Sequence, residues 1–352
     1  MKKTTNCLLC GAIAELKTDN FIGYQKQETF AIYHCVSCNT SFSLPRVDTT
    51  NIYNLIYQKG KEVPGYDRYW RYKETVKTHP NSLSFLLDTE ESYWGSISAL
   101  TKIVIDKQNT KILEVGCGMG YLTYSLIQAG YNATGLDISQ EAVDEANRSF
   151  GNHYICSNIF EYSEQHKNEY DIVIMTEVIE HIETPVKFLF ETTKLLKTKG
   201  YIILTTPNKT IYPNKVIWNT DLPPVHCWWL SEDSMKFIAN KINCKVDFVH
   251  FNDYYRKNFC KLILRQDYPI YRFGEDGEVI KKRNYSFLEK MNYLFFKSSI
   301  IKNGKYSFCE KFAYLFLSSK IFKKILCFFY PKTHYICNEK GVTMCAIFNK
   351  LN

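Results

Sequence analysis

The stretch that decides the fold is KILEVGCGMGYLTYSLIQAGYNATGLD, residues 111–137. It opens with an apolar strand pattern, Lys111–Val115, and continues through the glycine triplet GCGMG at 116–120 into a helix pattern. A second strand pattern, Asn132–Leu136, runs directly into the acid Asp137. A strand, a glycine-rich turn, a helix and a strand that ends in an acid predict the start of a nucleotide-binding parallel sheet.

The glycine triplet would let the backbone come close to a bound ligand. Gly116 and Gly118 have no Cβ and can adopt backbone angles that other residues avoid. A helix that starts near Gly120 directs its N–H groups into the same crevice, at the carboxyl ends of the strands. Asp137 can accept two hydrogen bonds from ribose hydroxyls. These features together predict a pocket for a dinucleotide or for S-adenosylmethionine (SAM).

Further strand and helix patterns alternate along the chain, which is typical of a doubly wound α/β sheet. The remaining strands are expected at His153–Cys156, Tyr170–Met175, Gly200–Thr205, Lys245–Phe251 and Val342–Phe348. Near-continuous apolar runs within them predict strands that are buried on both faces.

The triplet resembles motif I of class I SAM-dependent methyltransferases, because it has the spacing G-x-G-x-G and because Glu114 stands two residues before Gly116. The resemblance continues through GLDIS (135–139), EVIEHI (177–182), LLKTKG (195–200) and TTPN (205–208). It is greatest to the branch that contains ubiquinone-biosynthesis-type O-methyltransferases, and it covers about residues 108–252. A dehydrogenase is the alternative for this pocket.

The resemblance implies roles for individual residues. Glu114 would help to hold the amino-acid end of SAM, Asp137 the ribose, and Ile138 would pack on the adenine. Ser157-Asn158-Ile159 stands where the family often has an aspartate that contacts the adenine amine, and Asn158 keeps one acceptor for that contact. The full set of expected cofactor-binding residues is Glu114, Gly116, Cys117, Gly118, Gly120, Asp137, Ile138, Asn158, Ile159 and Glu177.

Acidic residues and a histidine follow the fourth strand. Glu177, Glu180 and His181 are spaced so that all three would share one face of a helix. A second histidine, His226, lies after the fifth strand, in a segment that reaches over the substrate pocket in this fold. These four residues are the candidate catalytic groups.

Three interpretations of these four residues stay open. His181 or His226 is a general base that takes the proton of an acceptor hydroxyl. Alternatively, two carboxylates and two imidazoles bind Mg²⁺, Mn²⁺ or Zn²⁺, which would hold the acceptor oxygen and lower its pKa. In the third, Glu-x-x-Glu-His only caps and orders a helix. The spacing also resembles small-RNA 2′-O-methyltransferases, so RNA is an alternative to a small molecule or glycan precursor as the acceptor.

Two C-x-x-C motifs near the N-terminus predict a zinc ribbon. Cys7 and Cys10 form the first motif and Cys35 and Cys38 the second, with a hairpin pattern over Tyr24–His34 between them. Four thiolates complete a closed tetrahedral Zn²⁺ site, which predicts a role in folding rather than in catalysis. Redox dithiols and core cysteines are the alternatives. A ribbon ahead of a methyltransferase resembles deoxysugar C-methyltransferases, which carry a large second α/β domain not found in this sequence.

Composition favours a globular protein of a reducing compartment. The 352 residues are 45% hydrophobic, which allows a sizeable core. The N-terminal residues lack the apolar core of a signal peptide, and no run of about 18 apolar residues predicts a membrane-spanning helix. We therefore expect a cytoplasmic protein, in which most of the cysteines are reduced core thiols.

Positive charge is concentrated in one segment. Residues 255–332 contain 17 Lys and Arg against 6 Asp and Glu, in a chain whose net charge is +8. Within 284–332, aromatic and aliphatic residues alternate with lysines. This segment is a lid with solvated lysines, a surface for contact with an anionic membrane at its inner face, or a patch for nucleic acid or an acidic carrier.

Aromatic residues also precede the sheet, where family members cover the cofactor with a helix. They are Tyr53, Tyr57, Tyr66, Tyr69, Trp70 and Tyr72. Most are expected in the core, and Tyr66 and Tyr69 are the candidates for a lid. We thus predict a Rossmann-like seven-stranded methyltransferase sheet with a small N-terminal zinc ribbon and a mainly helical C-terminal insertion. The predicted divisions are a ribbon at 1–45, an aromatic linker or lid at 46–107, a SAM-binding core at 108–252, the basic insertion at 253–340 and the last core strand at 341–352.

Overall fold

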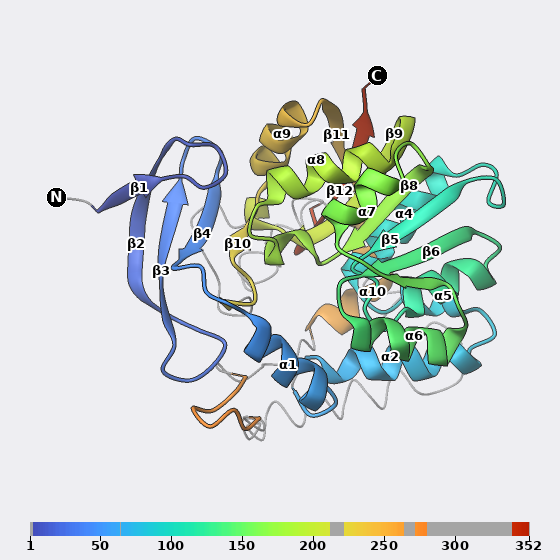
Figure 1. The fold of residues 1–352 in the computed structure, drawn as a ribbon, viewed down its shortest axis with the longest axis horizontal. Helices are drawn as coiled ribbons and strands as arrows, with labels where there is room; N and C mark the ends of the chain where they lie inside the picture. Colours follow the sequence, from blue (N-terminus) through green and yellow to red (C-terminus); the bar gives the residue numbers. More distant parts are fainter. Residues whose placement is uncertain (1–2, 64, 212–221, 264–271, 280–339, 352) are drawn as a thin grey trace.

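The structure is a computed structural model, and it describes residues 3–63, 65–211, 222–263, 272–279 and 340–351. A small antiparallel sheet lies on one side and a larger sheet covered by helices lies on the other (Figure 1). Among the described residues, no helix has the length and apolar character needed to cross a membrane.

The larger sheet has seven strands in the order β11-β12-β9-β8-β5-β6-β7. Their bounds are β5 (Lys111–Val115), β6 (Asn132–Asp137), β7 (Tyr154–Cys156), β8 (Tyr170–Thr176), β9 (Leu196–Pro207), β11 (Cys244–Phe248) and β12 (Thr343–Lys350). Strands β5 to β9 pair in parallel, whereas β12 is antiparallel to both of its neighbours. This confirms the predicted Rossmann-like sheet and all seven of its strands. The sixth strand ends at Phe248 rather than at Phe251.

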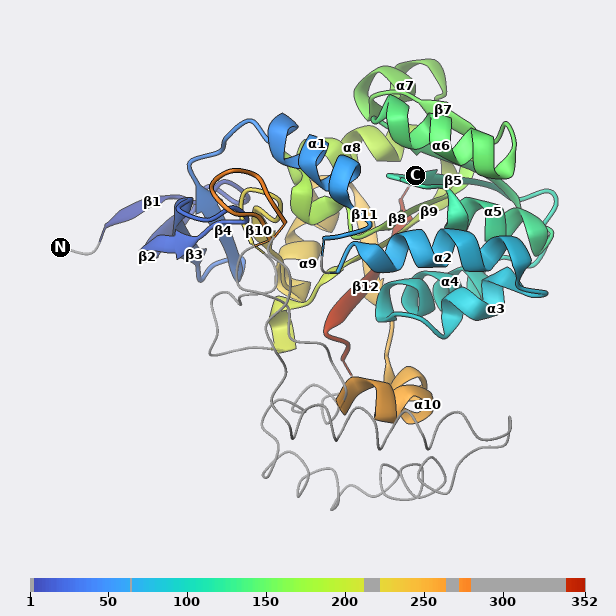
Figure 2. The ribbon, with the colours of Figure 1, turned by 90° about the horizontal axis from the view of Figure 1, so that it is seen from below.

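Helices cover both faces of this sheet, and Figure 2 shows them from below. The helices are α1 (Thr50–Lys59), α2 (Asp67–Thr78), α3 (Ser82–Leu87), α4 (Glu91–Ile103), α5 (Tyr121–Gln128), α6 (Gln140–Phe150), α7 (Ile159–Gln165), α8 (Pro185–Leu195), α9 (Glu232–Lys241) and α10 (Asn252–Ile263), with 3₁₀ turns η1 (Ile179–His181) and η2 (Lys209–Ile211). Four of these helices, α1 to α4, precede β5.

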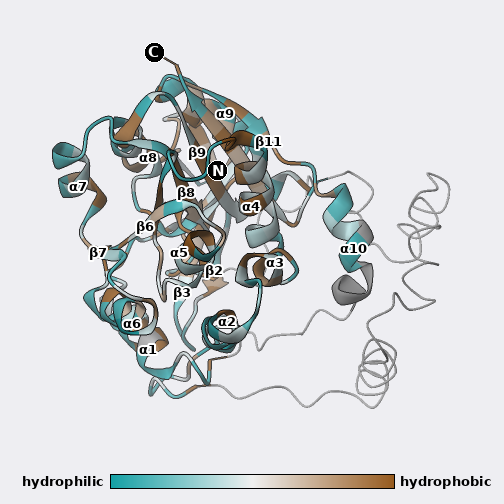
Figure 3. Cartoon of the chain, turned by 90° about the vertical axis from the view of Figure 1, so that its right-hand side faces the viewer, coloured by the Kyte–Doolittle hydropathy of each residue, from teal (hydrophilic) through white to brown (hydrophobic). Residues whose placement is uncertain are grey.

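The two faces of the sheet build separate parts of the core because successive side chains of a strand point in opposite directions. In β8, Val173 and Met175 pack with residues of α7, α8 and α9, whereas Ile172 and Ile174 pack with residues of α3, α4 and α5. Hydrophobic residues lie along the strands, and the outer side of α6 is hydrophilic (Figure 3).

The small sheet has the order β1-β2-β3-β4-β10. Its strands are β1 (Thr4–Asn6), β2 (Ile13–Ile22), β3 (Thr29–Cys35), β4 (Thr40–Leu44) and β10 (Trp228–Trp229). Strands β2 and β3 form a hairpin between the two cysteine motifs, as expected. Its first strand lies before the predicted range Tyr24–His34, and only β3 falls in the second half of that range. The fifth strand, β10, comes from the segment between β9 and α9, so the ribbon takes one strand from far along the chain.

The C-terminal insertion is described only at its beginning and at residues 272–279. Residue Phe273 packs with Tyr24 of the ribbon, and the main-chain N–H of Arg272 donates to the carbonyl of Tyr24 at 2.9 Å. Most of the predicted helical insertion, including the basic stretch 284–332, lies outside the described residues. The lid, membrane and nucleic-acid hypotheses for that stretch therefore remain predictions.

Candidate active site

The glycine triplet forms a sharp turn between β5 and α5. Gly116, Gly118 and Gly120 all have positive φ, at 74°, 50° and 78°. A Cβ on Gly116 would lie 2.5 Å from Cγ2 of Val178, whereas a Cβ on Gly118 would meet nothing within 4 Å. The turn is therefore packed against the segment after β8 on one side and leaves space beside Gly118.

The acid at the end of β6 is joined to this turn. Oδ2 of Asp137 accepts from the main-chain N–H of Gly118 at 2.7 Å, and Oδ1 accepts from that of Ser139 at 2.9 Å. Burial raises the pKa of Asp137, and these N–H donors oppose the rise. Next to it, the side chain of Ile138 is 72% exposed. An exposed isoleucine beside a buried acid suits a flat apolar ligand surface above the sheet edge.

Glu114 lies below the turn and is fully buried. Its Oε2 accepts from the main-chain N–H of Thr123, at 2.8 Å, and from the Thr123 hydroxyl. Burial raises the pKa of Glu114 to about 8, because the bonds from Thr123 offset only part of the desolvation. In this structure the carboxyl thus joins β5 to α5, the helix that starts at the cofactor side of the turn.

Three more of the expected cofactor residues follow strands β5 and β7. Cys117 is buried and packs with Val143 and Tyr154. Oδ1 of Asn158 accepts from the main-chain N–H of Phe160 at 2.9 Å, so Asn158 caps α7. The side chain of Ile159 is buried in the core. These three side chains have structural contacts, and their roles toward a cofactor stay predictions.

The segment after β8 differs from the helix that its spacing predicts. Glu177 has a positive φ of 54°, and its main-chain N–H donates to the carbonyl of Thr205 on β9 at 3.1 Å. A single 3₁₀ turn, η1, then carries Glu180 and His181. Positive φ at a non-glycine residue ends any helix there, so the prediction that Glu177 shares a helix face with Glu180 and His181 is wrong.

Three of the four candidate catalytic residues nevertheless come together. The ligand atoms of Glu180, His181 and His226 all lie within 4.8 Å of one another. Nε2 of His181 is 3.8 Å from Oε1 of Glu180, and the two imidazole rings meet edge to face with centroids 4.6 Å apart. We call these three residues the acceptor cluster. Val178, which touches the glycine turn, lies two residues before Glu180 in sequence, so the cluster lies near the cofactor side.

Hydrogen bonds orient this cluster. Oε2 of Glu180 accepts from the hydroxyl of Thr206 at 2.9 Å. Nδ1 of His181 lies 2.6 Å from the carbonyl oxygen of Val225. A carbonyl can only accept, so Nδ1 carries the proton and Nε2 of the neutral ring presents a lone pair. Burial lowers the pKa of His181, and burial with the neighbouring His181 and Arg272 holds the pKa of His226 well below 6.5.

One contact of the acceptor cluster was not predicted. The hydroxyl of Tyr53, on α1, lies 3.1 Å from Nδ1 of His181. Tyr53 belonged to the predicted aromatic group, but Tyr66 and Tyr69 were the expected lid residues. Those two rings pack edge to face with each other, with centroids 5.7 Å apart. Spacing along the chain carries no signal for a contact across 128 residues, so the sequence could not single out Tyr53.

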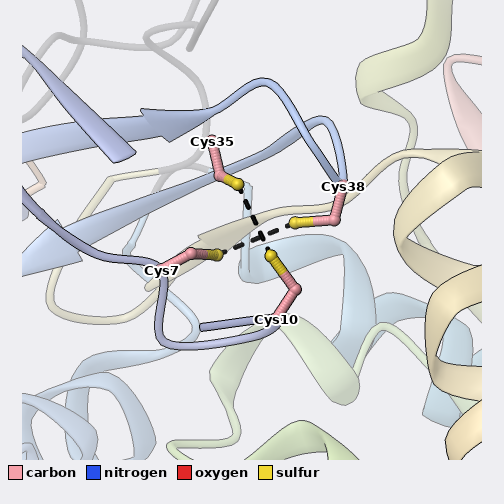
Figure 4. A group of neighbouring side chains, drawn as sticks. All are labelled: Cys7, Cys10, Cys35 and Cys38. Carbon is pink, nitrogen blue, oxygen red and sulfur yellow. Dashed lines mark hydrogen bonds between the residues drawn. The ribbon is translucent and has the colours of Figure 1, made fainter. Parts of the chain in front are cut away.

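The four ribbon cysteines converge on one point, as Figure 4 shows. The Sγ atoms of Cys7 and Cys38 are 3.7 Å apart, and those of Cys10 and Cys35 are 3.5 Å apart. Zinc bonded to four thiolates at about 2.3 Å in a tetrahedron requires sulfur separations of about 3.8 Å. A hydrogen bond from Cys38 lowers the pKa of Cys7. The residues present therefore fit Zn²⁺, and it would be held by these four side chains.

Comparison with known proteins bears on the sheet and its pocket. Residues 91–248 match a family described as a methyltransferase domain. The ubiquinone biosynthesis O-methyltransferase of Rickettsia bellii is 32% identical over 139 residues, which cover 38% of this chain and 53% of that protein. Residues 91–248 form a class I SAM-dependent methyltransferase domain.

The methyltransferase domain has a second relative of the same kind. The ubiquinone biosynthesis O-methyltransferase of Hydrogenovibrio crunogenus is 31% identical over 156 residues, which cover 40% of this chain and 64% of that protein. The chain thus spans about half to two thirds of the length of these two curated relatives. Among solved structures, it is similar to a SAM-dependent methyltransferase of Archaeoglobus fulgidus, with 15% identity, coverage of 72% of this chain and 92% of that chain, and a TM-score of 0.39.

Proposed function

We propose that this chain is a SAM-dependent O-methyltransferase that methylates a hydroxyl group of a small molecule or glycan precursor. The observation that carries the proposal is the convergence of Glu180, His181 and His226 beside a glycine turn of the methyltransferase domain. The two curated relatives named above are described as O-methyltransferases of ubiquinone biosynthesis, which favours an oxygen acceptor.

The glycine turn and the end of β6 would hold the cofactor. Asp137 would accept from the ribose hydroxyls, the exposed Ile138 would cover one face of the adenine, and Gly118 leaves room for the ligand. Bound SAM supplies a methyl group already activated by its sulfonium. Methyl transfer is then an in-line displacement, which depends mainly on the alignment of the acceptor oxygen.

The acceptor cluster would align that oxygen and receive its proton. Because Nδ1 of His181 donates to the carbonyl of Val225, Nε2 carries a lone pair and faces Glu180. A neutral imidazole with a lowered pKa is present in its basic form at neutral pH. His181 or His226 would therefore take the hydroxyl proton while the acceptor oxygen forms its bond to the methyl carbon.

A divalent metal at the same cluster is the second candidate mechanism, and the donor set favours it. Two imidazoles and one carboxylate with an open position are typical of catalytic metal sites. The second nitrogen of His181 donates to a main-chain carbonyl, as metal-binding histidines commonly do. Such an ion would hold the acceptor oxygen and lower its pKa. Glu177 lies outside this three-residue group, so a site with all four residues as ligands would need the Glu177 carboxylate to move closer.

Other acceptors remain alternatives. An RNA 2′-hydroxyl is favoured by the acid–histidine spacing and by the basic stretch that lies outside the described residues. C-methylation of a nucleotide sugar is a further alternative, because a zinc ribbon ahead of a methyltransferase domain resembles deoxysugar C-methyltransferases. A SAM-binding scaffold without turnover is the non-enzyme alternative.

The decisive experiment measures transfer of labelled methyl groups from SAM to a panel of phenols, nucleotide sugars and short RNAs. Methylation of an oxygen in the first two groups is the expected outcome, and it should be lost in Glu180→Gln. Tight binding of S-adenosylhomocysteine (SAH) without transfer to any acceptor would support the scaffold. Metal content, compared between wild type and Glu180→Gln, separates the two mechanisms. Only the metal-assisted mechanism predicts an ion that is lost with the Glu180 carboxylate, whereas the ribbon zinc should be retained in both proteins.

A further inference from the structure

The segment that carries His226 belongs to the ribbon sheet as much as to the methyltransferase domain. Strand β10 begins two residues after His226 and pairs with β4, with Trp228 opposite Phe42 and Trp229 opposite Ser41. Both tryptophans are buried. Figure 1 shows β10 between the ribbon and the larger sheet. The position of His226 is therefore set by a strand whose hydrogen-bonding partner is the ribbon.

Cys227 connects the two halves of the acceptor cluster to this strand. Its main-chain N–H donates to the carbonyl of Glu180 at 3.0 Å. Its carbonyl accepts from the main-chain N–H of Ser43 at 3.2 Å and from Nη1 of Arg46 at 3.1 Å. One residue thus holds η1, with Glu180 and His181, against the end of the ribbon that follows the second cysteine motif.

The second cysteine motif also contacts the methyltransferase domain directly. The carbonyl of Cys38 accepts from the hydroxyl of Ser234, on α9, at 3.1 Å, and this hydroxyl lies 2.7 Å from that of Thr40. Cys7, Cys35 and Cys38 are part of the same hydrophobic cluster as strands β5, β8 and β9. The expected metal ligands are therefore built into the core of the domain.

A buried lysine completes this connection. Lys209, on η2, is 2% exposed, and its Nζ donates to Oδ1 of Asn39, the residue after Cys38, at 2.7 Å. Its main-chain N–H donates to the carbonyl of Leu230, directly after β10, at 2.9 Å. Four thiolates around one Zn²⁺ carry a net charge of about −2. A buried ammonium is costly unless an opposite charge is near, and a metal-loaded site would supply that charge.

We propose that the metal-loaded site of the four ribbon cysteines positions the acceptor cluster. The loaded site would hold β4 and Lys209 in place. Strand β10 and Cys227, which contact β4 and Lys209's neighbour Leu230, would in turn hold His226 against Glu180 and His181. Lys209 is a positioning residue in this scheme, because its side chain acts through the ribbon and not on the acceptor. The inference rests on the proposed function only in calling the cluster the acceptor side.

Hydrogen exchange on the full-length protein, without acceptor, tests the proposal. The zinc-loaded and zinc-stripped proteins are compared at peptides that cover 222–231, with peptides of β5 and β6 as the internal reference. Removal of zinc should accelerate exchange at 222–231 while exchange at the reference peptides changes little. Equal exchange at 222–231 with and without zinc would overturn the proposal.

A second variant keeps the test informative if stripping zinc unfolds the protein. Lys209→Met removes the buried charge but keeps an apolar stem of similar length, and it is measured at saturating zinc. We expect a zinc affinity reduced by roughly 10- to 100-fold, as for other residues that support metal ligands, together with faster exchange at 222–231. Lys236→Met, an exposed lysine on α9, is the matched control and should behave as wild type.

The readouts separate this inference from the proposed function. SAH affinity should be the same in Lys209→Met and in wild type, because the glycine turn lies outside the ribbon contacts. Zinc-dependent exchange in a protein that methylates no acceptor would contradict the proposed function and leave the positioning role standing. Unaltered exchange and zinc affinity in Lys209→Met would contradict the positioning role, whatever the activity.

Discussion

Nδ1 of His181 donates a hydrogen bond of 2.6 Å to the carbonyl of Val225, the residue directly before His226. This bond joins two segments that leave different strands, β8 and β9. It fixes the ring that presents Nε2 to Glu180 and places the second imidazole beside it. The acceptor cluster therefore depends on one loop–loop hydrogen bond as well as on the sheet.

His226→Ala should reduce methyl transfer by roughly 10²- to 10⁴-fold, the usual contribution of a positioned acid–base group. SAH affinity should stay as in wild type, because His226 lies on the acceptor side. Transfer is measured with labelled SAM and SAH binding by calorimetry. His250→Ala, an exposed histidine after β11, is the control and should keep full activity. Full activity in His226→Ala would remove this residue from both proposed mechanisms.

Ile138→Ala should weaken SAH binding about 5- to 30-fold, since it removes about 1–2 kcal/mol of apolar contact with the adenine. The melting temperature should not fall, because the side chain is 72% exposed. Ile105→Ala is the matched control, since Ile105 is 100% exposed and lies before β5. An affinity of Ile138→Ala equal to that of the control would show that adenine lies elsewhere.

Gly116→Ala should abolish detectable cofactor binding and lower stability. Gly130→Ala is the matched control, because both glycines have positive φ, at 74° and 86°, but a Cβ on Gly130 meets nothing within 4 Å. Backbone strain should cost about 1–2 kcal/mol in each variant. The added contact with Val178 should cost Gly116→Ala roughly 1–3 kcal/mol more. Chemical denaturation measures this difference, and equal losses in the two variants would contradict the close packing of Val178 on the turn.

Glu114→Gln tests the buried carboxyl through pH. The pKa of Glu114 is about 8 in the folded protein against 4.5 as the ordinary value. Between these values the folded state keeps a proton that the unfolded state releases, so stability falls as pH rises, by as much as about 1.4 kcal/mol per pH unit. Glutamine accepts both bonds from Thr123 and does not titrate.

The variant should therefore gain stability relative to wild type between pH 5 and pH 8 on the order of 1 kcal/mol or more. Denaturation curves of the two cofactor-free proteins at several pH values give this difference. A difference that does not change with pH would mean that Glu114 is ionised in the folded protein throughout this range.

Zinc analysis tests the ribbon. Cys10→Ser should contain about one zinc ion fewer per chain than wild type and melt at a lower temperature, because metal binding contributes directly to folding. Cys156→Ser, a partly exposed cysteine on β7, should retain both properties. Full zinc content in Cys10→Ser would show that this thiolate is not a ligand.

Local signals in the sequence were sufficient for much of this protein. The alternation of apolar strands and helices predicted all seven strands of the larger sheet, and the C-x-x-C spacing predicted the convergence of four thiols. Both signals lie within short stretches, where backbone geometry relates spacing directly to direction. The turn at Gly116, Gly118 and Gly120 was also predictable from local sequence, because it connects β5 directly to α5.

Contacts between distant segments were decided only by the tertiary structure. The residue pattern predicted that Glu177 and Glu180 lie on one helix. In the structure, β8 pairs with β9 as far as Thr176, and the backbone then turns at Glu177, which has a positive φ. Tyr53 reaches His181, and β10 joins the ribbon, through docking of elements that no local spacing encodes. Sequence by itself thus determined the sheet, the glycine turn and the thiol cluster of this protein. The tertiary structure decided which side chains face the acceptor, because long-range packing sets their positions.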